Sequence, residues 1–211
     1  MIGATEGLHR LVEGNARFVR GTPVQRAPTP DQLAHLADAQ HPFATILGCS
    51  DSRVPPEMVF DQGPGDLFIV RVAGNVIGTE TLGSLGYALK HLATPLFVVL
   101  GHEGCGAVRA ALLAMTRGTT EEGTLGEILD AIRPALQSVD PREPVEAQLH
   151  LAVEANVRWV MRHLASNPVG RAALARAEIQ IVGAVYELTT GTVRFLDRSR
   201  QERSTTSAVK T

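Results

Sequence analysis

Apolar positions along the chain follow two different spacings. Residues 6–20 place apolar side chains three and four positions apart, which predicts an amphipathic helix. The sequence Thr29-Pro30-Asp31 is typical of a helix start and predicts a second, short helix to about residue 40. Short, mainly apolar runs predict four strands. These runs are residues 43–47, 67–72, 96–100 and 179–188.

Strand and helix patterns alternate through the rest of the chain. Further helices are predicted over residues 79–92, 104–115 and 144–165. Thr189-Thr190-Gly191 predicts a hairpin turn into an edge strand at residues 193–196. Strands that are apolar throughout are typical of a sheet covered by helices on both faces. The sequence therefore predicts an α/β fold with a mainly parallel central sheet of four strands, an antiparallel edge strand and flanking helices.

Composition narrows the class of protein. The chain has 211 residues, of which 44% are hydrophobic and 20% charged, which fits one globular domain. We expect that domain to span residues 1–198 and residues 199–211 to form a flexible tail. A net charge of −2 without a basic stripe argues against nucleic-acid binding. The chain has no apolar run long enough to cross a membrane and no secretory signal, so we expect a cytoplasmic protein without a membrane partner.

The two cysteines of the chain each follow a predicted strand. Cys49 comes after the first strand and Cys105 after the third, with His102 three residues before the second cysteine. Ligand sites of parallel sheets lie at the carboxyl ends of the strands, so we expect the three side chains to meet. Two thiolates and one imidazole are a zinc ligand set. Three protein ligands leave a fourth position for water or substrate, as in a catalytic zinc site.

An acidic and a basic residue follow Cys49 in the same loop. A bound zinc can lower the pKa of its water to about 7. Asp51 is placed to accept a hydrogen bond from the resulting hydroxide and to orient it, or else to take the fourth zinc position itself in a closed, inactive state. Arg53 can hold the Asp51 carboxylate in a bidentate fork, in which two guanidinium N–H groups donate to the two carboxylate oxygens. Asp51 and Arg53 are therefore the predicted catalytic pair.

Other interpretations of these residues remain open at this point. A free cysteine is often a small buried hydrophobic residue, and two cysteines can form a redox pair, although the chain has no C-x-x-C motif. Gly101-x-x-Gly-x-Gly is a candidate phosphate-binding turn, but its spacing differs from G-x-G-x-x-G. A zinc-stabilised or redox-sensing interaction protein would also use these residues, with a closed site.

The motifs Cys49-Ser-Asp-Ser-Arg53 and His102-x-x-Cys105-Gly together resemble the paired signature of the β-class carbonic anhydrases. The likeness runs from about residue 6 to residue 197. It includes segments 54–57, 60–66, 71–75 and 83–88. The resemblance implies reversible hydration of carbon dioxide to bicarbonate and a proton, with one zinc ion per subunit. A related zinc hydrolase acting on carbon disulfide or carbonyl sulfide is the alternative.

The resemblance also implies a substrate pocket and an assembly. By position, the pocket residues are Gln40, Phe68, Ala73, Tyr87 and Gly106. Tyr87 matches a tyrosine contributed across a dimer interface, and Gly106 matches a glycine whose N–H points at substrate oxygen. Members of the family form homodimers or tetramers of dimers. The N-terminal helix then packs on the partner, although packing on its own domain is not excluded by the sequence.

One position departs from a subgroup of the family. Members that bicarbonate switches off carry tryptophan three residues before the first zinc cysteine, where this chain has Ile46. The resemblance therefore favours the plant-like subgroup with an open site.

Overall fold

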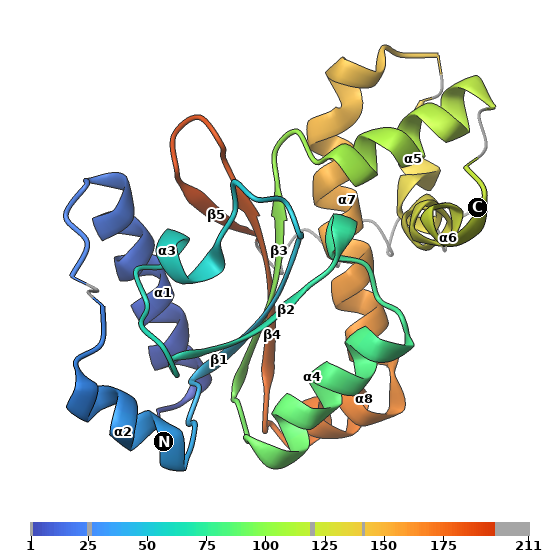
Figure 1. Cartoon of the computed structure of the whole chain (residues 1–211). Coiled ribbons are helices and arrows are strands. Elements are labelled where there is room, and N and C mark those ends of the chain that lie inside the picture. The colour runs from blue at the N-terminus through green and yellow to red at the C-terminus, as the bar shows by residue number, and fades with distance from the viewer. Residues whose placement is uncertain (1, 25–26, 119–120, 141, 197–211) are drawn as a thin grey trace.

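The structure is a computed structural model and describes residues 2–24, 27–118, 121–140 and 142–196 (Figure 1). Within these residues, one sheet has helices on both faces. Its strands are β1 (Ala44–Gly48), β2 (Leu67–Arg71), β3 (Leu96–His102), β4 (Gln180–Tyr186) and β5 (Val193–Leu196). The helices are α1 (Ala4–Val19), α2 (Pro30–Asp38), α3 (Pro56–Val59), α4 (Thr79–His91), α5 (Gly106–Arg117), α6 (Gly123–Ile132), α7 (Val145–Ser166) and α8 (Pro168–Ala175), with 3-10 turns η1 (Ala73–Asn75) and η2 (Arg133–Ser138).

The sheet has the strand order β2-β1-β3-β4-β5. The first four strands in this order are parallel, and β5 runs antiparallel to β4. The predicted fold class is thereby confirmed. In the pairing of the two central strands, Gly48 at the end of β1 lies opposite Leu100 in β3. β1 ends at Gly48 and β3 ends two residues past Leu100, at His102, so the chain leaves both strands at the same edge of the sheet.

Two apolar cores lie on the two faces of the sheet. Successive side chains of a strand point to opposite faces, and in β1 Ile46 joins one core while Leu47 joins the other. One core lies beneath α1 and α3, and the other beneath α4, α5 and α7 (Figure 1). Both faces of β1 and β3 are buried, which explains why their sequences are apolar except at Thr45 and His102.

Helix α1 packs on the sheet of its own chain. Leu11 is fully buried in the core beneath this helix. Asn15 donates through Nδ2 to the carbonyl oxygens of Val59 and Gly191, at 3.1 and 2.8 Å, and its Oδ1 accepts from the N–H of Val193 at 2.8 Å. The sequence left two placements of this helix open. Leu11 packs on its own domain, whereas Val12 and Val19 of the same helix are about half exposed. An additional contact of α1 with a partner stays a prediction.

Several boundaries and short helices differ from the sequence-based predictions. The helix predicted from residue 104 begins at Gly106, because Gly104 adopts a left-handed turn with φ of 63° after β3. Helices α3, α6 and α8 were not predicted. For α8 the signal was present, since the Asn167 side chain caps it ahead of Pro168. The division into a domain of residues 1–198 and a tail of residues 199–211 stays a prediction, because residues 197–211 lie outside the described part.

Among the described residues, no helix has both the length and the hydrophobicity that a membrane crossing requires.

Candidate metal centre

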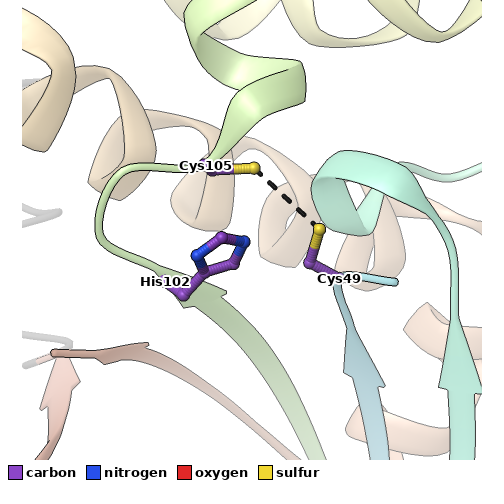
Figure 2. Close-up of side chains that lie close together, drawn as sticks. All are labelled: Cys49, His102 and Cys105. Carbon is purple, nitrogen blue, oxygen red and sulfur yellow. Dashed lines mark hydrogen bonds between the residues drawn. The ribbon is translucent and has the colours of Figure 1, made fainter. Parts of the chain in front are cut away.

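The three predicted metal ligands come together at the carboxyl edge of the sheet. Cys49 follows β1, His102 is the last residue of β3, and Cys105 directly precedes α5 (Figure 2). Their side chains point toward one another, and one ligand atom from each lies within 4.8 Å of the others. All three residues are buried. The topology thus brings together residues that are more than fifty positions apart in the sequence.

The geometry of this cluster fits a zinc ion. The two sulfur atoms lie 4.0 Å apart, whereas two sulfurs bound tetrahedrally to one zinc at about 2.3 Å would be about 3.8 Å apart. Nδ1 of His102 lies 2.9 Å from the carbonyl oxygen of Glu103. Since a carbonyl only accepts, Nδ1 bears the proton and Nε2 keeps a free lone pair. Nε2 is buried without a hydrogen-bond partner among the described residues, as expected of an atom that binds a metal.

The two thiols share one proton when no cation lies between them. The pKa of Cys49 is lowered to about 4, chiefly because its sulfur accepts a hydrogen bond from the Cys105 thiol. The pKa of Cys105 is raised by the same hydrogen bond and by burial. A second thiolate at this distance therefore requires a positive charge between the sulfurs, which a divalent cation supplies.

Asp51 lies beside the cluster but is held by Arg53. Nε of Arg53 donates to Oδ1 at 2.9 Å and Nη2 donates to Oδ2 at 2.7 Å. These bonds hold the pKa of Asp51 well below its usual range. Oδ2 is 3.7 Å from Nε2 of His102. The carboxylate is therefore turned toward Arg53, which is the open arrangement of the two that the sequence allowed.

Two residues that the sequence analysis did not assign support the Cys49 loop. Arg71, at the end of β2, donates to the carbonyl oxygens of Cys49 and Asp51 at 2.9 and 2.6 Å. The backbone N–H of Gly74 donates to Sγ of Cys49 at 3.3 Å. Both residues lie in the segment 71–75 that was noted for its resemblance, but the motif by itself does not show which atoms they contact.

Two of the predicted pocket residues flank the metal centre of their own chain. Ala73 directly precedes Gly74 in η1, and Gly106 directly follows Cys105 as the first residue of α5. A Cβ atom built on Gly106 would meet no other atom within 4 Å. The backbone of Gly106 therefore faces open space next to a metal ligand.

The other three predicted pocket residues lie elsewhere on the same chain. Gln40 is exposed between α2 and β1, before the amino end of the sheet. Phe68 pairs with Thr45, four residues before Cys49 and about 13 Å from it along the strand. The Tyr87 ring lies with its centroid 6.1 Å from that of Phe68, and Tyr87 is 48% exposed. Gln40, Phe68 and Tyr87 therefore do not line the metal centre of their own chain.

Comparisons with known proteins agree with this fold and site. A family model described as "Carbonic anhydrase" matches residues 44–193. The chain is 41% identical to carbonic anhydrase 2 of Mycobacterium tuberculosis over 189 residues, which cover 86% of this chain and 87% of that protein. It is 32% identical to a carbonic anhydrase of Pseudomonas aeruginosa over 196 residues, which cover 89% of this chain and 86% of that protein.

Solved structures give the same result. The β-carbonic anhydrase CcaA superposes with a TM-score of 0.71 at 28% identity, covering 92% of this chain and 96% of that one. The β-carbonic anhydrase CafA of Aspergillus fumigatus gives 0.70 at 27% identity, covering 98% of both chains. Fold and ligand set define an α/β protein with a three-ligand metal centre. The chain belongs to the carbonic anhydrase family, in its β class.

Proposed function

We propose that this protein catalyses the reversible hydration of carbon dioxide to bicarbonate and a proton. The observation that carries the proposal is the buried cluster of Cys49, His102 and Cys105, with Asp51 beside it and turned away toward Arg53. The relatives reported above are carbonic anhydrases, so carbon disulfide and carbonyl sulfide are not favoured as substrates.

One zinc ion per subunit would be held by Cys49, His102 and Cys105. When bound there, zinc supplies Lewis acidity that allows water to ionise near neutral pH. Asp51 is ionised and therefore accepts hydrogen bonds but does not donate them. Arg53 holds this carboxylate so that it can accept the hydrogen of the attacking oxygen and direct the lone pair at carbon. The N–H of Gly106 is available to an oxygen of the substrate.

A dimer, or a tetramer of dimers, completes the substrate pocket in this proposal. Gln40, Phe68 and Tyr87 lie far from the metal centre of their own chain, so they can line a pocket only at the centre of a partner. The half-exposed ring of Tyr87 supports such a contact. A cytoplasmic location belongs to the same proposal, because both cysteines are free thiols and thiol ligands persist in reducing surroundings.

Stopped-flow measurement of carbon dioxide hydration on the zinc-loaded protein tests the activity. We expect a rate well above that of buffer near pH 8, and loss of that rate in Cys49→Ala together with loss of zinc. In Asp51→Asn we expect a fall of about 10²-fold or more with zinc retained. A wild-type rate equal to that of buffer would contradict the proposal, and sulfide release from carbon disulfide would favour the alternative substrate.

Light scattering coupled to gel filtration tests the assembly. We expect a mass of at least two chains in the active fraction. A monomer that hydrates carbon dioxide at the full rate would show that Gln40, Phe68 and Tyr87 are not needed from a partner.

A further inference from the structure

Helix α7 has a polar side chain in its apolar face. Val153, Val157 and Val160 on this face are buried in the core beneath the helix, and Asn156 lies among them with 1% of its surface exposed. Its Oδ1 has no hydrogen-bond partner within the described part of the chain. Burying an amide in this way costs free energy that a leucine at the same position would not cost. The side chain therefore requires an explanation other than packing.

Among the described residues, the one side-chain hydrogen bond of Asn156 leads to the metal centre. Its Nδ2 donates to the carbonyl oxygen of Gly74 at 2.9 Å. The N–H of the same residue, Gly74, donates to Sγ of Cys49 at 3.3 Å. Two hydrogen bonds thus connect the middle of α7 to a metal-ligating sulfur through a single glycine.

The surroundings of Gly74 make its position sensitive to this bond. Gly74 has a φ of 67°, which L side chains rarely adopt. A Cβ atom there would lie 2.8 Å from Cδ1 of Ile132 and 3.1 Å from Cβ of Ala107. Side chains of α6 and α5 thus enclose the Cα of Gly74, and Asn156 fixes the carbonyl oxygen on one side of this Cα from α7. The direction of the Gly74 N–H depends on all three helices.

We propose that Asn156 is a positioning residue for the metal centre, which holds the backbone of Gly74 on its carbonyl side so that the N–H of the same residue donates to the Cys49 sulfur. The inference rests on the proposed function in one respect, namely that the centre binds zinc. A thiolate that accepts an N–H bond is stabilised and fixed in direction. Groups that orient metal ligands in this way typically change metal affinity by about 10- to 100-fold when they are lost.

The test uses two matched variants on the same helix. Asn156→Leu removes the amide and retains most of the volume. Gln148→Leu is the control, because Gln148 is also a buried amide of α7 bonded to backbone, but its partners are in Asp140 and Glu143. Zinc affinity of each reduced protein is measured by competition with a chromophoric chelator, after urea unfolding has established that the apo protein is folded.

We expect Asn156→Leu to bind zinc about 10- to 100-fold more weakly than the wild type and Gln148→Leu to bind within about twofold of it. The sulfur-to-cobalt charge-transfer band of the cobalt-substituted protein should move in the first variant and not in the second. Equal zinc affinity in Asn156→Leu and the wild type overturns the inference, as does an equal loss in both variants. A wild type that binds no zinc would instead overturn the proposed function.

A second measurement does not depend on the folding of a variant. In the wild-type protein loaded with NMR-active cadmium, the N–H···S bond should give a scalar coupling between the metal and the Gly74 amide proton. Absence of this coupling overturns the inference, whatever zinc affinities the variants show. If Asn156→Leu fails to fold, Asn156→Ala, which adds no new bulk, takes its place with the same expected loss of affinity.

Discussion

Arg53 binds the Asp51 carboxylate through two nitrogen atoms of its guanidinium group and through its own backbone N–H. The distances are 2.9 Å from Nε to Oδ1, 2.7 Å from Nη2 to Oδ2 and 3.0 Å from the backbone nitrogen to Oδ1. Asp51 is the second residue after Cys49 and Arg53 the fourth, so the same loop provides a candidate metal ligand and its neighbouring carboxylate. These hydrogen bonds hold the carboxylate toward Arg53, with its Oδ2 3.7 Å from Nε2 of His102.

Replacing Arg53 with alanine should therefore leave zinc bound and remove most of the activity. Without the fork, Asp51 is free to rotate toward the metal ligands, only 3.7 Å from His102 Nε2. We expect the rate of carbon dioxide hydration to fall by about 10²-fold, because a positioned hydrogen-bonding group typically contributes that much. Stopped-flow kinetics measures the rate, and atomic absorption measures the zinc content.

The chain contains its own control for this substitution. Arg142 forms the same fork with Asp140, with distances of 2.9 Å from Nε to Oδ1 and 2.6 Å from Nη2 to Oδ2. Arg142→Ala removes an equal charge and an equal fork far from the metal centre in sequence, and its rate should stay within about twofold of the wild type. Comparable losses in Arg53→Ala and Arg142→Ala would contradict a specific role for the Asp51–Arg53 pair.

Zinc should stabilise the folded chain through the thiol ligands. A ligand that binds only the folded state adds about 4 kcal/mol when its free concentration is 1,000 times its dissociation constant. We expect the melting temperature of the reduced apo protein to rise on addition of zinc. In Cys105→Ser the rise should be mostly lost, since a serine hydroxyl is a poorer zinc ligand than a thiolate. Differential scanning calorimetry with and without zinc checks this, and an equal rise in both proteins would argue against Cys105 as a ligand.

The cluster of Cys49, His102 and Cys105 could be predicted from the sequence because two simple patterns coincide at these residues. Apolar runs end at Gly48 and near His102, and parallel strands bring such ends to one edge of a sheet. The sheet itself could be predicted because its buried strands have apolar residues on both faces.

The contacts around these ligands could not be predicted in the same way. The bond from Asn156 to Gly74 joins positions 82 residues apart, and it depends on how three helices pack around one peptide. The only sign of this bond in the sequence is Asn156 itself, a polar residue in the apolar face of the helix predicted over residues 144–165. Gln40 and Phe68 were predicted to line a substrate pocket. Whether that pocket is in their own subunit or in a partner depends on the assembly, which the sequence pattern of one chain does not determine.

The packing of α1 on its own sheet predicts a large effect of Leu11→Ala. Leu11 is fully buried, and truncation of a buried leucine typically costs about 2–5 kcal/mol of stability. Val12, the next residue, is 45% exposed, so Val12→Ala should change stability by less than about 0.5 kcal/mol. Urea unfolding of both variants measures the difference.

The same experiment distinguishes the two placements of α1. If Leu11 packs within its own chain, the loss in Leu11→Ala should be independent of protein concentration. A loss that shrinks as the protein is diluted to the monomer would mean that α1 stabilises the fold through a partner subunit.

Glu154 gives the fold a pH dependence that is separate from the metal centre. Burial tends to raise the pKa of this carboxyl, but hydrogen bonds from Arg158 and Arg194 outweigh it, and the pKa lies below its ordinary value of 4.5. Arg158, one turn further along α7, donates at 2.8 Å, and Arg194 donates at 3.2 Å and connects β5 with α7. A lowered pKa stabilises the folded state above the ordinary pKa, and this stabilisation is lost as the pH falls through the lowered value.

We therefore expect Glu154→Gln to be less stable than the wild type near neutral pH, by no more than about 1 kcal/mol because solvent screens a partly exposed pair. The difference should shrink as the pH falls below 4.5, where the wild-type carboxyl also becomes neutral. Urea unfolding near pH 7 and near pH 3, within the range where the fold persists, measures it. The exposed Glu57, changed to glutamine, controls for a simple loss of charge. A difference for Glu154→Gln that stays constant between the two pH values would mean that its effect arises from packing and not from its charge.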